Sequence, residues 1–125
     1  MERMNPSVVS IVRLHYHLEE GNLASHLAED FVFDTGFETI PRDEYLVVQR
    51  GVGAIESFQV QDAFAAADRA AIMFEGTDSV TGLFHRYCWL VTFNREKVTR
   101  ISACAANLPS PDSARTTAAN GPPTR

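Results

Sequence analysis

The chain has 125 residues, of which 45% are hydrophobic, and a formal net charge of −5, which suits one domain with its own hydrophobic core. The acidic balance argues against nucleic acid or an anionic membrane surface as a partner. No apolar run approaches the roughly 20 residues that cross a bilayer, and the N-terminus lacks the apolar core of a secretory signal, so we expect a cytoplasmic protein with no membrane partner.

The first 50 residues predict two helices with a strand between them. Residues 8–20 carry apolar side chains at helical spacing and are followed by a Gly-Asn stop signal. Residues 23–30 predict a short helical stretch, and residues 31–37, rich in phenylalanine, predict a strand. Residues 42–50 predict a second helix, because acidic residues come early and arginine late, as the helix dipole favours.

Four strands are predicted next, at residues 54–65, 69–79, 83–93 and 97–107, separated by short polar or turn-rich breaks. Consecutive strands with short links pair antiparallel, so the fold class is α+β with the helices on one face. A strand of eleven residues runs about 36 Å at roughly 3.3 Å per residue. Strands of this length must curve around the helices, which makes a cone.

The last part of the chain has a different composition. Residues 108–125 hold four of the six prolines and no aromatic residue. Such a segment cannot bury enough apolar area to offset the entropy of ordering it. We therefore expect a single domain at residues 1–107 and a disordered tail at residues 108–125.

Two stretches carry a resemblance to a known superfamily. EEGNLASHLAEDFVF is similar to the opening of its members, in which a helix leads through glycine, a second short helix and acidic residues into an apolar strand, and WLVTFNREKVTRISA is similar to their final long hairpin. Over residues 8–107 the chain resembles the nuclear transport factor 2-like superfamily, which includes SnoaL-like polyketide cyclases, ketosteroid isomerase, limonene epoxide hydrolase and scytalone dehydratase. The resemblance implies a cystatin-like α+β barrel, a cone-shaped curved antiparallel sheet wrapped around the N-terminal helices, with a cavity for a small hydrophobic substrate.

The resemblance leaves the chemistry of that cavity open. In a comparison anchored on the final hairpin, the carboxylic acid position of ketosteroid isomerase falls on Trp89, and the position of its base falls near Thr35. The helix tyrosine of that enzyme falls near Leu14, and a shift of one turn brings up Tyr16 or His17. The sequence does not support a ketosteroid isomerase mechanism.

An alternating row in the third of the four strands is the strongest local pattern. His85, Tyr87 and Trp89 stand at every second position, which places them on one face of a strand. A three-residue loop after this strand predicts these opposite partners: Ile101 for Trp89, Ala103 for Tyr87 and Ala105 for His85. The space beside the small side chains must be filled by another core element or by a ligand. The expected substrate contacts are Phe33, Phe74, Tyr87, Trp89, Ile101 and Ala103.

His85 and Asp34 are the sheet residues that could exchange a proton with a ligand. Imidazole titrates near pH 6.5, so His85 could act as an acid or base beside the aromatic row; the alternative is a histidine at the rim or bonded to a neighbouring carbonyl. Asp34 would have a raised pKa and act as a general base if it pointed inward. In the alternative, Phe31 and Phe33 face inward, and Asp34 faces water or caps the turn that follows.

The first predicted helix adds His15 and Tyr16 to the candidate catalytic residues. Successive helical residues point about 100° apart, so only one or two of His15, Tyr16 and His17 can face the sheet. His15 continues the apolar stripe of the helix and is interpreted as pointing inward. Tyr16 could donate its hydroxyl to a ligand carbonyl, or it could be a core residue whose hydroxyl is already bonded.

The sequence carries no cofactor or metal motif. His15, His85 and Asp34 have the residue types that bind zinc or iron, but no HxH pattern on a strand or HxxxH pattern on a helix supports a site. We expect neither a metal nor a cofactor. Cys88 and Cys104 lack CxxC spacing and are interpreted as reduced packing residues that a hairpin could bring close together.

These observations together predict a small-molecule-binding SnoaL-like protein. The expected activity is cofactor-free acid/base catalysis on an apolar organic substrate, as in an isomerase, dehydratase, cyclase or epoxide hydrolase. The alternative is a non-catalytic ligand-binding or dimerisation module of the same fold. Phe84, Leu90 and Val98, assigned to the outer face of the sheet, predict a homodimer.

Overall fold

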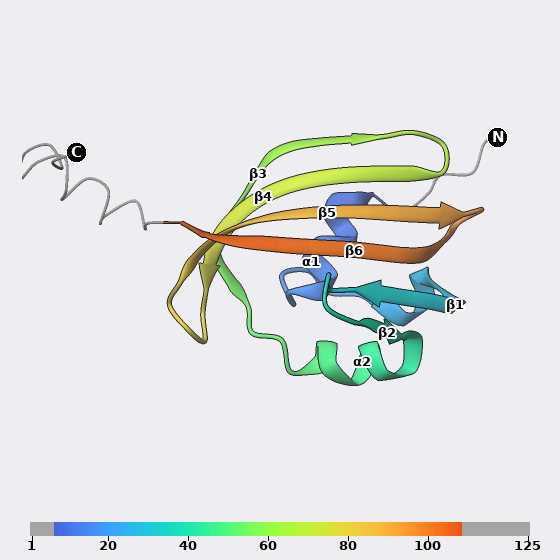
Figure 1. Ribbon diagram of the computed structural model, residues 1–125, viewed down its shortest axis with the longest axis horizontal. Coiled ribbons are helices and arrows are strands. Elements are labelled where there is room, and N and C mark those ends of the chain that lie inside the picture. The colour runs from blue at the N-terminus through green and yellow to red at the C-terminus, as the bar shows by residue number, and fades with distance from the viewer. Residues whose placement is uncertain (1–6, 109–125) are drawn as a thin grey trace, which may run out of the picture.

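The computed structural model describes residues 7–108 (Figure 1). Its elements are α1 (Val8–His15), the 3-10 helix η1 (Leu23–His26), β1 (Leu27–Asp34), β2 (Thr39–Pro41), α2 (Arg42–Arg50), β3 (Ile55–Ala65), β4 (Arg69–Asp78), β5 (Phe84–Asn94) and β6 (Lys97–Leu108). The predicted α+β class is confirmed. The expected tail from residue 109 onward lies outside the described residues, whereas Leu108 still belongs to β6 and pairs with Phe84.

The six strands form one sheet in the order β2-β1-β6-β5-β4-β3. Figure 1 shows the long strands β3 to β6 as a curved surface, with α1 packed against β3 and β4 and with α2 beside β1 and β2. The strands from β3 to β6 pair antiparallel as predicted, but β1 pairs parallel with β6. Within residues 7–108, no helix is long and apolar enough to cross a membrane.

The first helix is shorter than the sequence predicts. It ends at His15, and His17 has a φ of 61° that turns the chain away. The side-chain amide of Gln49, on α2, donates hydrogen bonds to the carbonyl oxygens of Leu14 and His15. The Leu14 carbonyl also accepts from the backbone N–H of His17, and the Gln49 amide gives the His15 carbonyl a partner at the end of the helix. A residue distant in sequence therefore helps to stabilise the end of α1.

The segment after α1 also differs from its prediction. The 3-10 helix covers four residues, and β1 begins at Leu27 rather than at Phe31. The short strand β2, which the sequence analysis missed, pairs with the end of β1. Together these strands bring the N-terminal part of the chain against β6.

The aromatic row of β5 faces the helices, as the sequence analysis requires for a row that packs in the core or lines a cavity. Tyr87 and Trp89 are buried, as are the next two residues of the same parity, while Arg86, Cys88 and Leu90 are exposed on the outer face. Val98 does not lie on the outer face as predicted. It is fully buried opposite Phe93, because the tight turn places both on the inner side.

The hairpin between β5 and β6 has a different register from the predicted one. Its loop holds two residues, Arg95 and Glu96, and Arg95 has a φ of 62°, the left-handed conformation that tight hairpin turns require. A bulge beside Thr92 adds a further shift. The predicted pairing is wrong by two positions; the observed partners are Ala103 for Trp89, Ala105 for Tyr87 and Asn107 for His85. A shift of two keeps the alternation, and it places alanines opposite Trp89 and Tyr87, whereas the prediction placed them opposite Tyr87 and His85.

Candidate functional site

A cavity of about 330 Å³ lies at the C-terminal end of α1. Strand β1 ends opposite Ser102, whereas β6 continues for six more residues, which leaves the region beside residues 103–105 without a covering strand in the described structure. The cavity lies at this step in the sheet. Its walls are mainly aromatic and heterocyclic rings; they come from His15, Tyr16, Phe33, Phe37, Tyr87 and Trp89, with Thr35, Ala103, Cys104 and Ala105 completing the lining.

His15 lines the cavity and is held by a tyrosine from α2. Its Nδ1 atom lies 2.7 Å from the hydroxyl oxygen of Tyr45, which is buried. Burial, with a smaller contribution from the charge of His17, lowers the pKa of His15 to about 3, so the imidazole is neutral at neutral pH. A buried hydroxyl needs an acceptor, and His15 Nδ1 is the atom within hydrogen-bonding distance of the Tyr45 hydroxyl. The hydroxyl therefore donates to Nδ1, and the neutral ring carries its proton on Nε2.

Neighbouring rings fix the orientation of the His15 imidazole. It stacks on Phe33 with ring centres 5.8 Å apart and meets Trp89 edge-on at 5.0 Å. Tyr16 packs edge-on against it at 4.5 Å. A ring held on several sides in this way presents Nε2–H in one direction, which is the preorganisation that a recognition group needs.

Tyr16 and Tyr87 form a second polar group in the cavity. Their ring centres are 5.7 Å apart. Burial raises the pKa of Tyr87 to about 12 and that of Tyr16 still further. Both hydroxyls therefore stay protonated at neutral pH. Among the residues that line the cavity, none carries a formal charge at neutral pH, and the tyrosine hydroxyls can both donate and accept hydrogen bonds.

The cavity brings together part of the predicted site. His15 and Tyr16 both line it, together with four of the predicted substrate contacts: Phe33, Tyr87, Trp89 and Ala103. Phe74 and Ile101 are fully buried in the core and do not line it. They support the walls, since Phe74 stacks on Tyr87 with ring centres 4.7 Å apart.

Asp34 lies outside this cavity, and the expectation of an inward carboxylate with a raised pKa is wrong. Phe33 faces inward, so Asp34 has the outward parity and accepts a hydrogen bond from the backbone N–H of Gly36 at 2.8 Å. Its other carboxylate oxygen lies 2.8 Å from a guanidinium nitrogen of Arg100. The Gly36 N–H and the Arg100 guanidinium lower the pKa of Asp34. The residue caps a turn, as the alternative interpretation states.

His85 shares the inner face with Tyr87 but does not line the cavity with His15. Its ring lies edge-on to Tyr87 with centres 5.5 Å apart. The Nδ1 atom of His85 is buried and has no hydrogen-bond partner within the described residues. His85 is therefore one ring removed from the cavity, with a polar atom that remains unsatisfied.

Three residues that matter here were missed by the sequence analysis. Tyr45 and Gln49 were read only as parts of a helix, although both are buried and contact the end of α1. Phe37, at the turn after β1, lines the cavity mouth and is 98% exposed. Tyr45 and Gln49 share one helix face at i and i+4 spacing, which is the signal that could have identified them as inward residues.

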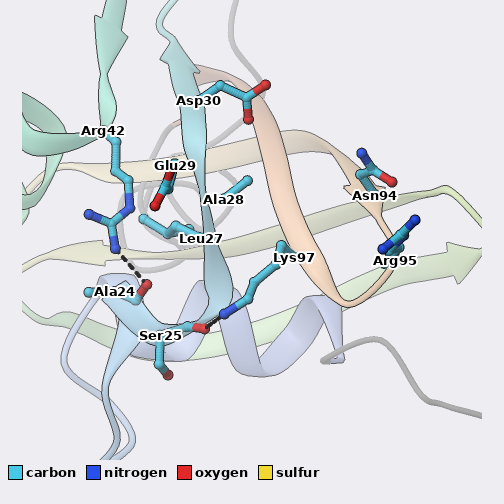
Figure 2. Close-up of a pocket in the computed structure, with 10 residues that line it drawn as sticks. All are labelled: Ala24, Ser25, Leu27, Ala28, Glu29, Asp30, Arg42, Asn94, Arg95 and Lys97. Atoms are coloured by element: carbon cyan, nitrogen blue, oxygen red, sulfur yellow. Dashed lines mark hydrogen bonds between the residues drawn. The ribbon is translucent and has the colours of Figure 1, made fainter.

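A second hollow, of about 860 Å³, lies at the opposite end of β1 (Figure 2). It forms where β1 carries four residues between its pairs with β6 and β6 carries only one. Figure 2 shows Arg42 and Lys97 reaching backbone carbonyl oxygens, those of Ala24 at 3.0 Å and Ser25 at 2.6 Å. These charged groups therefore hold η1 and the start of β1 in place.

Comparison with known proteins found no matching protein-family model and no matching curated protein. Solved structures do match along most of the chain. A protein of Kribbella flavida DSM 17836, described as a candidate ketosteroid isomerase, is 19% identical and has a TM-score of 0.63, with 93% of this chain and 82% of that chain covered.

Two further structures give similar matches. A protein of Catenulispora acidiphila DSM 44928 with a ketosteroid isomerase-like fold, solved with trimethylamine, is 17% identical with a TM-score of 0.57, covering 80% of this chain and 85% of that one. An NTF2-like protein of unknown function from Cytophaga hutchinsonii ATCC 33406 is 11% identical with a TM-score of 0.59, covering 78% and 95%. At these identities the likeness concerns architecture. The chain has the fold of the nuclear transport factor 2-like superfamily.

Proposed function

We propose that the protein binds a small, largely apolar organic molecule carrying one hydrogen-bond-accepting oxygen in the cavity at the end of α1. The observation that carries this proposal is the Tyr45–His15 hydrogen bond of 2.7 Å, which leaves a neutral imidazole with Nε2–H as its remaining donor. Aromatic walls favour the apolar body of the ligand. The Nε2–H group, or the Tyr16–Tyr87 hydroxyl pair, receives its oxygen.

The proposal is tested with two probes that differ only by a carbonyl group, 1-indanone and indane. Binding followed by NMR chemical shifts is expected to be tighter for 1-indanone by about 10-fold, the equivalent of one net hydrogen bond. Replacing Tyr45 by phenylalanine frees the imidazole tautomer, so the 1-indanone affinity is expected to fall towards that of indane. Indane binding should change little.

Lys97→Ala, in the polar hollow at the other end of β1, is the matched control. It should leave both affinities unchanged, because its ammonium group bonds the Ser25 carbonyl and does not reach the cavity. Equal wild-type affinities for the two probes would contradict the assignment of an oxygen-recognising group. Shift changes centred on the residues of the polar hollow would contradict the location.

Acid/base catalysis is a second candidate function, and one observation favours it. A neutral donor that polarises a carbonyl acidifies the adjacent carbon, and a titratable residue, His85, lies one ring away from the cavity, beside Tyr87, with an unsatisfied Nδ1. Two structures of this fold are described as candidate isomerases, and another was solved with the small amine trimethylamine. The likenesses support a small organic ligand and leave the reaction open.

The catalytic candidate has its own test, exchange of the C2 hydrogens of 1-indanone in deuterated water. Because His85 does not line the cavity, the C2 proton would reach its imidazole through one bridging water. His15 would stabilise the enolate oxygen, and a solvent deuteron would return to carbon. The wild type is expected to exchange faster than buffer alone, and His85→Gln is expected to lose the excess rate while retaining binding. Exchange at the buffer rate in the wild type would restrict the function to binding.

A further inference from the structure

Three sulfur-bearing side chains form a row across the outer face of the sheet. Met73 on β4 lies opposite Cys88 on β5, and Cys88 lies opposite Cys104 on β6. All three have the parity opposite to the buried residues of their strands, so they face away from α1. Both cysteines are free thiols and exposed, and Met73 is half-buried.

Cys88 and Cys104 are direct partners on adjacent antiparallel strands, a separation that suits a bridging ion. The Cys104 sulfur lies 3.7 Å from the carbonyl oxygen of Cys88, so its side chain leans towards β5. Cβ atoms of directly opposite residues in an antiparallel pair are about 4.5–5.5 Å apart, whereas a disulfide prefers about 3.8 Å. An ion bound by two sulfurs, with metal–sulfur bonds of roughly 2.3 Å in the case of zinc, spans the wider separation without moving the strands.

We propose that Cys88 and Cys104, assisted by the thioether of Met73, bind one Cu(I) ion on the outer face of the sheet. Thiolate and thioether ligands select soft ions, of which Cu(I) is the one that accepts a thioether readily. Structural zinc sites require four nitrogen or sulfur ligands, and the described residues contain no group of three or more His, Cys, Asp or Glu placed to hold a metal. The inference replaces the expectation of no metal site and does not rest on the ligand cavity.

Binding couples to protonation and charge in a defined way. Each thiol releases one proton when it ligates the ion, so two protons leave and the two thiolates with Cu(I) carry a net charge of −1. Arg86, two residues before Cys88 on the same face, is bonded to Glu75 at 2.6 Å and 2.9 Å. The Arg86 guanidinium is the nearest cation along β5 on this face, and it offsets part of that negative charge.

The test is an anaerobic competition titration of the reduced chain against the Cu(I) complex of bicinchoninate. The wild type is expected to take one ion per chain with release of two protons. Cys88→Ser and Cys104→Ser should each lose uptake under competition, and Met73→Leu should weaken it about 10-fold, as expected for a supporting group. Lys97→Ala, in the polar hollow beside Ser25 and away from the three sulfur atoms, is the control and should retain uptake.

Circular dichroism checks that each variant is folded. Light scattering gives the number of chains in each particle, and together with the titration it gives the number of chains per ion. Uptake that persists in either serine variant would overturn the site, because these are the only two cysteines in the chain. One ion per two chains would also overturn it, in favour of a site shared between copies.

Discussion

The two hollows at the ends of β1 differ in size and in chemistry. The larger one is lined by charged groups that already bond backbone carbonyl oxygens, as Arg42 and Lys97 do. The smaller one has aromatic walls, no formal charge, and a His15 ring fixed by Tyr45. The two hollows would therefore offer a ligand different surroundings, charged groups in one and aromatic rings in the other.

The difference follows from what each hollow would gain by binding a ligand. In the polar hollow a ligand would have to displace water from charged groups, which costs free energy. Two of these groups already bond backbone carbonyl oxygens, although the buried Nε of Arg42 has no partner within the described residues. In the aromatic cavity a ligand would cover apolar surface and meet a donor with a fixed orientation. Recognition is therefore expected where the polar groups are few and held by the protein itself.

The prediction with the largest expected effect on stability compares the loss of one wall residue from each hollow. Trp89 is 2% exposed and packs against His15 and Phe33, so Trp89→Ala should lower the free energy of unfolding by about 3–5 kcal/mol. Lys97→Ala should change it by no more than about 0.5 kcal/mol, because surface substitutions have small effects. Urea denaturation measures both, and equal losses would show that the two hollows are equally structural.

The strands and the inner aromatic row could be predicted because alternation is a local property of the sequence. The stretch from Arg69 to Asn94 carries its own pattern of inward and outward residues, and the structure follows it. The end of α1 could not be predicted in the same way, since Gln49 helps to stabilise it from 34 and 35 residues away. Nor does a local pattern specify that β1 joins β6 in parallel.

The candidate site was predicted in part for the same reason. His15, Tyr16 and Trp89 belong to periodic segments whose inward faces could be read from the sequence. The partner of His15 is Tyr45, 30 residues away on another helix, and no spacing rule connects them. Asp34 was open to both interpretations, because its direction depends on a one-residue change of parity at the end of β1.

An effect of similar total size, spread over several pH units, is expected from the titration of His15. The pKa of His15 is about 3 in the folded chain and 6.5 for the free side chain. Between about pH 3 and pH 6.5, His15 is therefore protonated in the unfolded chain and neutral in the folded chain. Stability should therefore fall as the pH is lowered from 6.5 towards 3, by about 1.4 kcal/mol for each pH unit attributable to this group. The contribution of His15 to the free energy of unfolding is fully present above pH 6.5.

Asp34 titrates at lower pH than most of the range in which His15 affects stability, so the pH dependence separates the contributions of the two residues. Its pKa is lowered below 3.8, so the stability it contributes is present above that value and is lost only under more acidic conditions. Melting temperatures between about pH 4 and pH 6.5 therefore report on His15. His15→Gln, which cannot titrate, should flatten the slope in this window. A slope unchanged by the substitution would mean that the imidazole is not held in its neutral form.

The smallest effect on folding is expected on the outer face, where we propose that a second copy of the chain docks. Leu90 is 50% exposed there, beside an apolar hollow of about 450 Å³ that Ala71 also lines. Light scattering should show a wild-type dimer that Leu90→Asp converts to a monomer, with little change in melting temperature because the side chain is half in water. Leu83→Asp, at a leucine 48% exposed in the turn before β5, is the control and should remain dimeric. A monomeric wild type would contradict the proposed dimer. A dimer that covers this face would slow copper uptake by Cys88 and Cys104, and Leu90→Asp would then restore the rate of uptake.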